Sequence, residues 1–279
     1  MRNWLRKNYP KLWDTLKTLY SSTSYYKKKV GRIEERHKIN KEITLKHESI
    51  IMEKVFNSEY IVQNGPFRGM KYIKNSSGSA LLPKILGSYE EPIHSWVENI
   101  IKTSVYTKIL DIGCAEGYYA VGFAQACPKA DVIAYDLDQN AIVLCQELAL
   151  LNKVSNITFK TNCDHLELNK QCVQNTLIFC DIEGTESYLL DIDKAEGLKQ
   201  VDLIVESHDC FVPEVSDLLI DRFYNSHTIH IVVDYPFRIE KYSTPNPATQ
   251  AELLELFDEK RPKFMKFLFL KSKENGYVS

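Results

Sequence analysis

Apolar positions in the second half of the chain follow two alternating periods. Short apolar runs, typical of buried strands, lie at residues 108–112, 131–136, 156–161, 176–181, 201–207, 229–235 and 264–272. Segments with the period of a helix separate most of these runs, at residues 118–126, 139–152, 185–194, 213–224 and 248–260. Strands that alternate with helices indicate βαβ units. The pattern therefore predicts an α/β fold built on a mainly parallel sheet.

The pattern before residue 108 is different. Residues 2–20 place tryptophans and leucines roughly on one side, with basic residues elsewhere, and Pro10 would kink or split such a helix. Residues 21–32 show no clear period and are typical of a linker, whereas the charged residues 33–56 favour a helix. We therefore expect a helical extension in front of the α/β region.

Two further elements precede the first apolar run. Residues 65–73 have the pattern of a strand that follows a turn, and residues 92–102 have that of a helix with one apolar face. These patterns divide the chain into three regions. We expect a basic, helical extension at 1–60, a β-hairpin and helix at 61–107 that form a candidate lid over substrate or cofactor, and the main domain at 108–279.

Charge is unevenly distributed, although the whole chain carries a formal net charge of only −2. Residues 1–30 contain eight basic residues and one acidic residue, which leaves a net charge of −9 on the remainder. An acidic body disfavours a broad nucleic-acid-binding surface, so we expect no nucleic-acid partner. The basic, tryptophan-containing segment 2–20 has three alternatives: contact with a membrane surface, packing on the domain, or packing on a second subunit of a homo-oligomer.

The sequence lacks the marks of a secreted or membrane-spanning chain. No apolar run approaches 18 residues, and the N-terminal residues lack the apolar region of a signal peptide. The seven cysteines are odd in number and form no C-x-x-C pair, which favours reduced thiols over disulfides or a zinc site. We therefore expect a cytoplasmic protein, with contact on the cytoplasmic face of a membrane as the alternative for residues 2–20.

The segment Lys108–Ala120, KILDIGCAEGYYA, joins an apolar strand to a helix through a turn that contains two glycines. Ligands of such folds bind at the carboxyl ends of the strands, and glycine lets the backbone approach them closely. The spacing Gly113-x-x-x-Gly117 differs from the G-x-G-x-x-G turn of dinucleotide sites. Asp111 beside the turn disfavours a pyrophosphate and suits an ammonium or sulfonium. These residues favour S-adenosylmethionine over NAD.

Carboxylates after the next two predicted strands agree with this interpretation. Asp136 ends the second strand, where it can accept from both hydroxyls of a ribose. Asp164 follows the third strand, where it can accept from an adenine amino group. The alternative is that these acids only cap helices or lie in solvated turns. Together with Asp111 they predict a cofactor site.

The residues LDIGCAEGYYA, followed by VIAYDLD, resemble motif I and the acidic second-strand end of class I S-adenosylmethionine-dependent methyltransferases. The resemblance covers about residues 89–272 and implies a Rossmann-like, seven-stranded sheet that is mainly parallel, with its last strand antiparallel. Ala115 stands where the family often has glycine, so we expect a negative φ there. The expected cofactor-binding residues are Asp111, Gly113, Cys114, Ala115, Gly117, Tyr118, Asp136, Leu137, Asp164 and Asp181.

A second resemblance narrows the expected reaction. LIFCDIEGTESYLL at 177–190 is similar to the D-x-E-G-x-E segment of FkbM-type methyltransferases, and LIVESHD at 203–209 is similar to their next strand end. Members of that family typically methylate oxygen, often a sugar hydroxyl. The resemblance therefore implies O-methylation of a sugar, glycan or natural-product acceptor. The fourth strand also lacks the Asn/Asp-Pro-Pro-aromatic ending of amino-methylating nucleic-acid enzymes, which favours oxygen.

Ionisable side chains gather after the fourth and fifth predicted strands, namely Asp181, Glu183, Glu186, Glu206, His208 and Asp209. Methylation of an alcohol requires a positioned acceptor and removal of its proton, which a neutral imidazole accomplishes near pH 7. We therefore expect His208 to be the general base, oriented by Asp181 or Asp209. The expected acceptor-binding residues are Tyr89, Glu90, Glu183 and Glu206.

Other roles for these acids stay open. Asp181, Glu206 and Asp209 could bind a divalent cation such as Mg²⁺, which would polarise the acceptor. Glu183 and Glu186 could be first-turn acids of a helix, favoured by its dipole. For Glu186 this structural interpretation is the stronger one.

Two other functions compete with catalysis of methyl transfer. One is a non-catalytic S-adenosylmethionine-binding scaffold or assembly subunit, and the other is an NAD-dependent oxidoreductase. Six ionisable groups at two strand ends argue against a scaffold. The glycine spacing and the acid beside the turn argue against the oxidoreductase.

Overall fold

The computed structural model divides the chain into two compact units, residues 1–51 and 52–279. The residues that it describes are 24–76, 79–234, 241–261 and 265–274. The predicted helix at 2–20 lies outside them. Helix α3 (Ser24–Phe56) confirms the predicted helix at 33–56 but begins nine residues earlier, within the predicted linker. A single glycine, Gly31, costs a helix only about 1 kcal/mol, which does not interrupt it.

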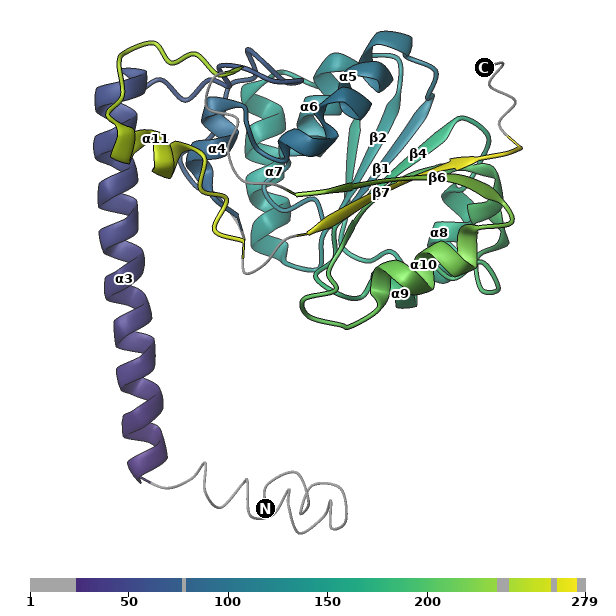
Figure 1. Cartoon of the computed structure of the whole chain (residues 1–279), viewed down its shortest axis with the longest axis horizontal. Helices are drawn as coiled ribbons and strands as arrows, with labels where there is room; N and C mark the ends of the chain where they lie inside the picture. The colour runs from purple at the N-terminus through teal and green to yellow at the C-terminus, as the bar shows by residue number, and fades with distance from the viewer. Residues whose placement is uncertain (1–23, 77–78, 235–240, 262–264, 275–279) are drawn as a thin grey trace. The chain divides into compact units, whose positions relative to one another are not determined.

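The strands of the described residues form one seven-stranded sheet in the order β3-β2-β1-β4-β5-β7-β6 (Figure 1). Their bounds are β1 Lys108–Ile112, β2 Asp131–Tyr135, β3 Ile157–Lys160, β4 Thr176–Cys180, β5 Asp202–Ser207, β6 His227–Val233 and β7 Lys266–Ser272. Strands β1 to β5 pair in parallel, whereas β7 pairs antiparallel with both β5 and β6. The predicted α/β class, the mainly parallel sheet and the antiparallel last strand are confirmed.

Helices cover both faces of this sheet, with α5, α6 and α7 on one side and α8, α9 and α10 on the other (Figure 1). Their bounds, with those of α4 and α11, are α4 Leu81–Leu86, α5 His94–Thr103, α6 Tyr118–Ala126, α7 Gln139–Leu151, α8 His165–Gln171, α9 Glu186–Leu189, α10 Val215–Phe223 and α11 Gln250–Leu256. The predicted helix at 185–194 shrinks to the single turn of α9. Helix α8 was not predicted, because its seven residues show little apolar periodicity.

The centre of the sheet is largely apolar. Strands β4 and β5 are buried at every residue, and four of the five residues of β1 are buried. This explains why their sequences are continuous apolar runs, since a strand covered on both faces has no polar side. One polar exception is Asp202, which accepts hydrogen bonds from the hydroxyl of Tyr106 at 2.6 Å and the backbone of Ser272 at 2.8 Å. Its buried carboxylate is therefore satisfied.

The described residues of the segment before β1 contain the predicted helix, which is α5, but not the predicted hairpin. Among the described residues of 61–107, strand pairing is limited to one bridge between Ile61 and Lys71. The segment docks instead through Phe67, whose ring lies edge-on to the rings of Tyr118 and Phe123 with centroids 5.3 and 5.4 Å apart. Aromatic packing on α6 therefore replaces the expected strand pairing.

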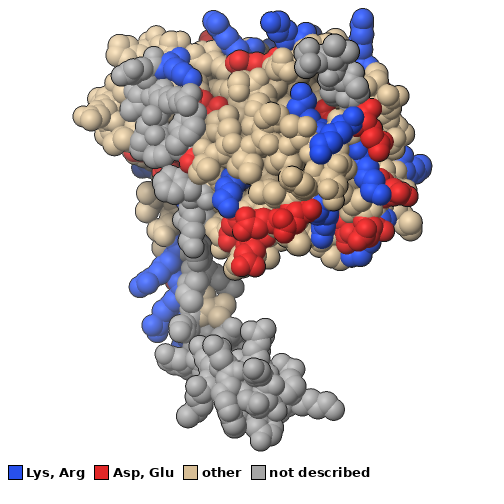
Figure 2. All heavy atoms as spheres, turned by 45° about the vertical axis from the view of Figure 1, so that its right-hand side comes forward, with Lys and Arg blue, Asp and Glu red and all other residues tan. Residues whose placement is uncertain are grey.

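The face of residues 52–279 drawn in Figure 2 carries interspersed basic and acidic side chains, with acidic ones gathered into a group at its lower edge. That face presents no continuous basic surface among its described residues.

None of the helices that the structure describes is both long enough and apolar enough to cross a membrane.

The packing of the Phe67 segment against α6 can be tested at Gly122. A methyl group at Gly122 would lie 2.6 Å from the ring of Phe67, whereas at Gly31 it would have no neighbour within 4 Å. We expect Gly122→Ala to lower the free energy of unfolding by about 1–3 kcal/mol, because overpacking outweighs the gain in helix propensity. Urea unfolding followed by circular dichroism measures this. Gly31→Ala is the matched control and should not lower the midpoint; a stabilised Gly122→Ala would contradict the packing.

Candidate active site

A cavity of about 630 Å³ opens at the carboxyl ends of the parallel strands. It is lined by residues of the turns after β1, β2, β3, β4 and β5. Further lining residues come from the segments before α5 and before β7, namely Ser79, Lys84, Tyr89, Glu90, Glu259, Lys260, Arg261 and Met265. In a doubly wound sheet this edge is where the connections diverge and leave room for a ligand. The fold therefore brings the predicted cofactor and acceptor residues to one place.

The glycine turn forms the floor of the cavity. Gly113 has a φ of 88°, and a Cβ there would lie only 1.6 Å from the carbonyl oxygen of Asp181. Ala115 has a φ of 48°, which corrects the expected negative value. Its amide donates to Oδ2 of Asp136 at 2.9 Å, which helps to offset the roughly 1–2 kcal/mol cost of the left-handed conformation. Gly117 faces Cys145 and does not line the cavity.

Asp111 is the most unusual acid of this wall. It is 2% exposed, and its Oδ2 has no hydrogen-bond partner among the described residues. Its pKa is raised to about 8, chiefly by burial and also by the charges of Asp136 and Glu90, against the lowering effects of a backbone hydrogen bond from Ala120 and the charge of Lys84. A buried carboxyl with one oxygen that lacks a hydrogen-bond partner is suited to a cationic group of a ligand.

The residues predicted to bind the ribose and the adenine differ in their positions relative to the cavity. Asp136 and the 80% exposed Leu137 line the cavity, and Asp136 also accepts from the backbone of Asp138 at 2.8 Å. Asp164 does not line it, because its side chain caps α8 by accepting from the amide of Glu167 at 2.9 Å. The structure therefore gives Asp164 the capping role that was its alternative. The cavity wall there consists of Thr161, Asn162 and Cys163.

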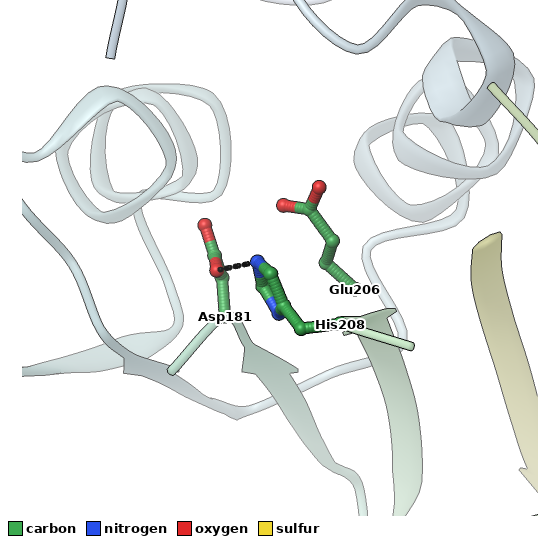
Figure 3. A group of neighbouring side chains, drawn as sticks. All are labelled: Asp181, Glu206 and His208. Atoms are coloured by element: carbon green, nitrogen blue, oxygen red, sulfur yellow. Dashed lines mark ion pairs between the residues drawn. The ribbon is translucent and has the colours of Figure 1, made fainter. Parts of the chain in front are cut away.

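His208 lines the same cavity, beside Asp181 and Glu206 (Figure 3). Its Nδ1 donates to Oε1 of Glu186 at 2.7 Å. Its Nε2 lies 3.5 Å from Oδ1 of Asp181 and 3.6 Å from Oε2 of Glu183. Because Nδ1 carries the proton, Nε2 is the basic nitrogen of the neutral ring. Glu186, and not Asp181 or Asp209, therefore orients the imidazole.

Glu186 has the helical position expected of it, but sequence reasoning missed its contact with His208. It begins α9, as a first-turn acid would, but it is fully buried and also accepts from the amide of Gly184 at 3.0 Å. Its signal in the sequence was the glycine two residues earlier, which folds the loop back onto the carboxylate. Burial lowers the pKa of His208, but the hydrogen bond to Glu186 and the charge of Glu206 more than compensate, so that this pKa lies above its usual value.

Asp209 does not join the site. It accepts from the amide and hydroxyl of Ser216 at 2.9 and 2.7 Å, and Lys266 lies 3.2 Å away. Although burial raises its pKa, these partners lower it below the usual value. Asp209 therefore holds the start of α10. It does not line the cavity, which corrects its assignment as a catalytic or metal-binding residue.

One arginine, Arg261, forms ion pairs with several acids that line the cavity. Arg261 is 13% exposed and pairs with Glu206, with Glu90 at 3.1 Å and with Glu259 at 2.9 Å. Tyr119 donates to the other oxygen of Glu90 at 2.7 Å. No motif in the sequence indicated Arg261, because it lies in an irregular segment between α11 and β7.

Burial governs the protonation of these acids. Desolvation raises the pKa of Glu206 to about 7 against the opposing effect of Arg261, and it raises that of Glu259 to about 8. It also raises the pKa of Asp181 well above its usual value, with Glu206 and Glu90 contributing. The cavity therefore holds several acids that retain or release protons near neutral pH.

The residues able to hold a metal ion differ from those predicted. Ligand atoms of Asp181, Glu206 and His208 all lie within 4.8 Å of one another (Figure 3). His208 thus replaces Asp209 in the predicted set. The donors are one imidazole and two carboxylates, which suit several divalent cations. Arg261 pairs with Glu206 and competes with a cation for that carboxylate.

Comparison with known proteins agrees with this geometry. Residues 104–214, which contain β1 to β5, match a family model described as a methyltransferase domain. The match supports an S-adenosylmethionine-dependent methyltransferase domain in this part of the chain. Over 175 residues the chain is 31% identical to a release factor glutamine methyltransferase of Flavobacterium psychrophilum, which covers 61% of this chain and 56% of that protein. The chain thus spans little more than half the length of this relative.

Two solved structures are similar to the chain at low identity. TrmN from Thermus thermophilus is 15% identical with a TM-score of 0.42, over 68% of this chain and 48% of that protein. An S-adenosylmethionine-dependent O-methyltransferase from Thermotoga maritima is 13% identical with a TM-score of 0.44, over 64% of each chain.

The role of Glu186 can be measured directly. We expect Glu186→Gln to lower the pKa of His208 by about 1 to 3, because the amide replaces a charged partner of the imidazolium. NMR titration of isotope-labelled histidine rings gives this value. His227, which is buried and bonded to the carbonyl of Val201, is the internal control, and its resonance should not respond. An unchanged pKa of His208 would show that Glu186 does not control its protonation.

Proposed function

We propose that this protein is an S-adenosylmethionine-dependent methyltransferase that methylates a hydroxyl oxygen. The observation that carries the proposal is the imidazole of His208. It is fixed through Nδ1 by a buried carboxylate and presents Nε2 to the same cavity that the glycine turn enters. The methyltransferase-domain match over residues 104–214 supports the cofactor half of the proposal.

The residues of the cavity fit the cofactor. The partnerless oxygen of Asp111 suits its ammonium, and Asp136 lies where a ribose hydroxyl can be bound. Gly113, Cys114 and Ala115 present backbone without bulky side chains to the ligand. When bound, S-adenosylmethionine supplies a methyl group already activated on a sulfonium.

The protein's own contribution is to place the acceptor and accept its proton. A hydroxyl that donates to Nε2 of His208 would transfer its proton to that nitrogen, and the imidazolium formed would lie between Glu186 and Asp181. Because the pKa of His208 is raised, the ring is neutral and basic only as the pH rises through that value. The rate should therefore increase with pH over this range.

The acceptor class that we favour is a sugar, glycan or natural-product hydroxyl, with Tyr89, Glu90, Glu183 and Glu206 on the acceptor side. All four line the cavity. The support for a sugar is the resemblance of the D-x-E-G-x-E and ESHD segments to FkbM-type methyltransferases. Glu90 and Glu206 are held by Arg261, which leaves the more exposed Glu183 as the acid most accessible to an acceptor.

A second candidate follows from the relative that modifies glutamine. The similarity of this chain to a release factor glutamine methyltransferase favours an amide nitrogen on a protein as the alternative acceptor. Participation of a divalent cation at Asp181, Glu206 and His208 is a variant of either candidate. Acceptor screening with and without Mg²⁺ separates these cases.

The first test is calorimetric titration with S-adenosylhomocysteine, with NAD titrated in parallel. We expect binding of S-adenosylhomocysteine but not of NAD, and Asp136→Ala should weaken it by about tenfold or more, or ~1.4 kcal/mol. Asp131→Ala, at the opposite and exposed end of β2, is the matched control and should bind like the wild type. Absence of S-adenosylhomocysteine binding would refute the proposal, and binding of NAD would favour an oxidoreductase.

The catalytic test follows methyl transfer to hydroxyl-bearing acceptors such as nucleotide sugars. We expect His208→Asn to lower kcat by about 10²–10⁴, which is typical for loss of a general base, without abolishing cofactor binding. His230→Asn, on the exposed face of β6, is the control and should leave kcat unchanged. Full activity of His208→Asn would exclude His208 as the base. Cofactor binding without turnover on any acceptor would favour the scaffold.

A further inference from the structure

A buried lysine, Lys84, lies in the wall of the cavity. Lys84 belongs to α4, where every residue is buried, and it is itself 2% exposed. Its Nζ donates to Oγ of Ser79 and to Oε1 of Glu116, each at 2.5 Å, and lies 4.9 Å from the ring centroid of Tyr89. These two acceptors use two of the three N–H donors of the ammonium.

The same wall carries the partnerless acid. The charge of Lys84 helps to stabilise ionised Asp111, which shows that the two groups interact across the cavity lining. Both residues line the cavity, as does Ser79. A cation and an anion that line one cavity and influence each other electrostatically are complementary to a ligand that carries both an ammonium and a carboxylate.

We propose that Lys84, with Ser79, binds the carboxylate of the cofactor's amino-acid end while Asp111 binds its ammonium. This inference rests on the proposed function, since it assigns a residue to that cofactor. The acidity of this end of the cavity supports it. Without a cation here, the ligand's carboxylate would face Asp111 and its neighbours Glu90 and Asp136, all of one sign.

The other basic residues of the lining are less suited to this role. Arg261 already pairs with four carboxylates, and the side chain of Lys260 is exposed. Lys84, in contrast, is held in place. Its partner Glu116 is fully buried and also accepts from the hydroxyl of Tyr72 at 2.7 Å. A buried ion pair contributes little net stability, so its presence in the wall is explained better by ligand binding.

The experiment compares two ligands on two proteins by calorimetry. S-adenosylhomocysteine carries the amino-acid end, whereas 5′-methylthioadenosine has the same adenosine and sulfur without it. We expect Lys84→Met to weaken S-adenosylhomocysteine binding by about tenfold or more and to change methylthioadenosine binding by less than about twofold. Equal losses for both ligands would mean a purely structural role for Lys84, and no loss for either would mean no role in binding. Both outcomes would overturn the inference.

Decarboxylated S-adenosylmethionine tests the contribution of the carboxylate to binding, because it differs from S-adenosylmethionine only in lacking that group. The wild type should bind it about tenfold or more weakly than S-adenosylmethionine, and Lys84→Met should bind the two alike. If Lys84→Met does not fold because Glu116 loses its partner, the double variant Lys84→Met/Glu116→Gln removes both charges and serves instead. Lys84→Arg keeps the charge and should retain part of the discrimination. A wild type that binds none of these ligands would refute the proposed function itself, which is a different result from loss of discrimination.

Discussion

The close approach of two backbones at the carboxyl edge of the sheet determines the rest of the site. Gly113 lies so near the carbonyl of Asp181 that a methyl group at position 113 would stand 1.6 Å from that oxygen. β1 and β4 are neighbours in the sheet, and only a residue without a side chain lets the two turns that follow them meet. The turn after β1 carries residues of the proposed cofactor site, and the turn after β4 carries the acids beside His208. The absence of one side chain therefore brings the two halves of the proposed reaction together.

Desolvation of the carboxyls is the second influence on the site, because it sets the pKa values of the cavity acids. Asp111, Asp181, Glu206 and Glu259 all lose water around their carboxyls, and the pKa of each is raised for that reason. Arg261 and Lys84 are the buried cations that limit this effect. Arg261 is paired with acids on different segments of the chain and Lys84 with Glu116 in the turn after β1, so the charges of the cavity also connect its walls. The same network thus serves both the electrostatics and the geometry of the site.

Sequence reasoning predicted the sheet well, because buried strands produce unbroken apolar runs whose spacing is easily recognised. It also placed His208, Asp181 and the glycine turn in one cavity, since parallel strands end at one edge. It failed where a role depends on a contact that spacing does not encode. Glu186 and Asp209 are both acids near a strand end, and only the path of the loop decides which of them reaches His208.

The short elements show the same limit. Asp164 has the position of a ligand-binding acid and the geometry of a helix cap, and α8 is too short to have been predicted from its apolar pattern. The prediction of a hairpin before β1 was wrong. The segment around Phe67 packs on α6 through the ring of that residue and does not pair as strands beyond one bridge. Arg261 has no sequence signal at all, since a single arginine in an irregular segment is unremarkable until its partners are known.

The position of β7 has a consequence for the order in which the molecule is completed. Strand β6 pairs in the sheet with β7, and β7 pairs with β5, so the edge beyond β5 closes only when residues 266–272 are inserted. Arg261 lies a few residues before β7, and it neutralises Glu206 on β5 and Glu90 before α5. During synthesis, Glu206 and Glu90 therefore gain their partner Arg261 only after nearly the whole chain has been made. Completion of the sheet and assembly of the cavity are one event, and an incompletely made chain retains the uncompensated negative charge of an unfinished site.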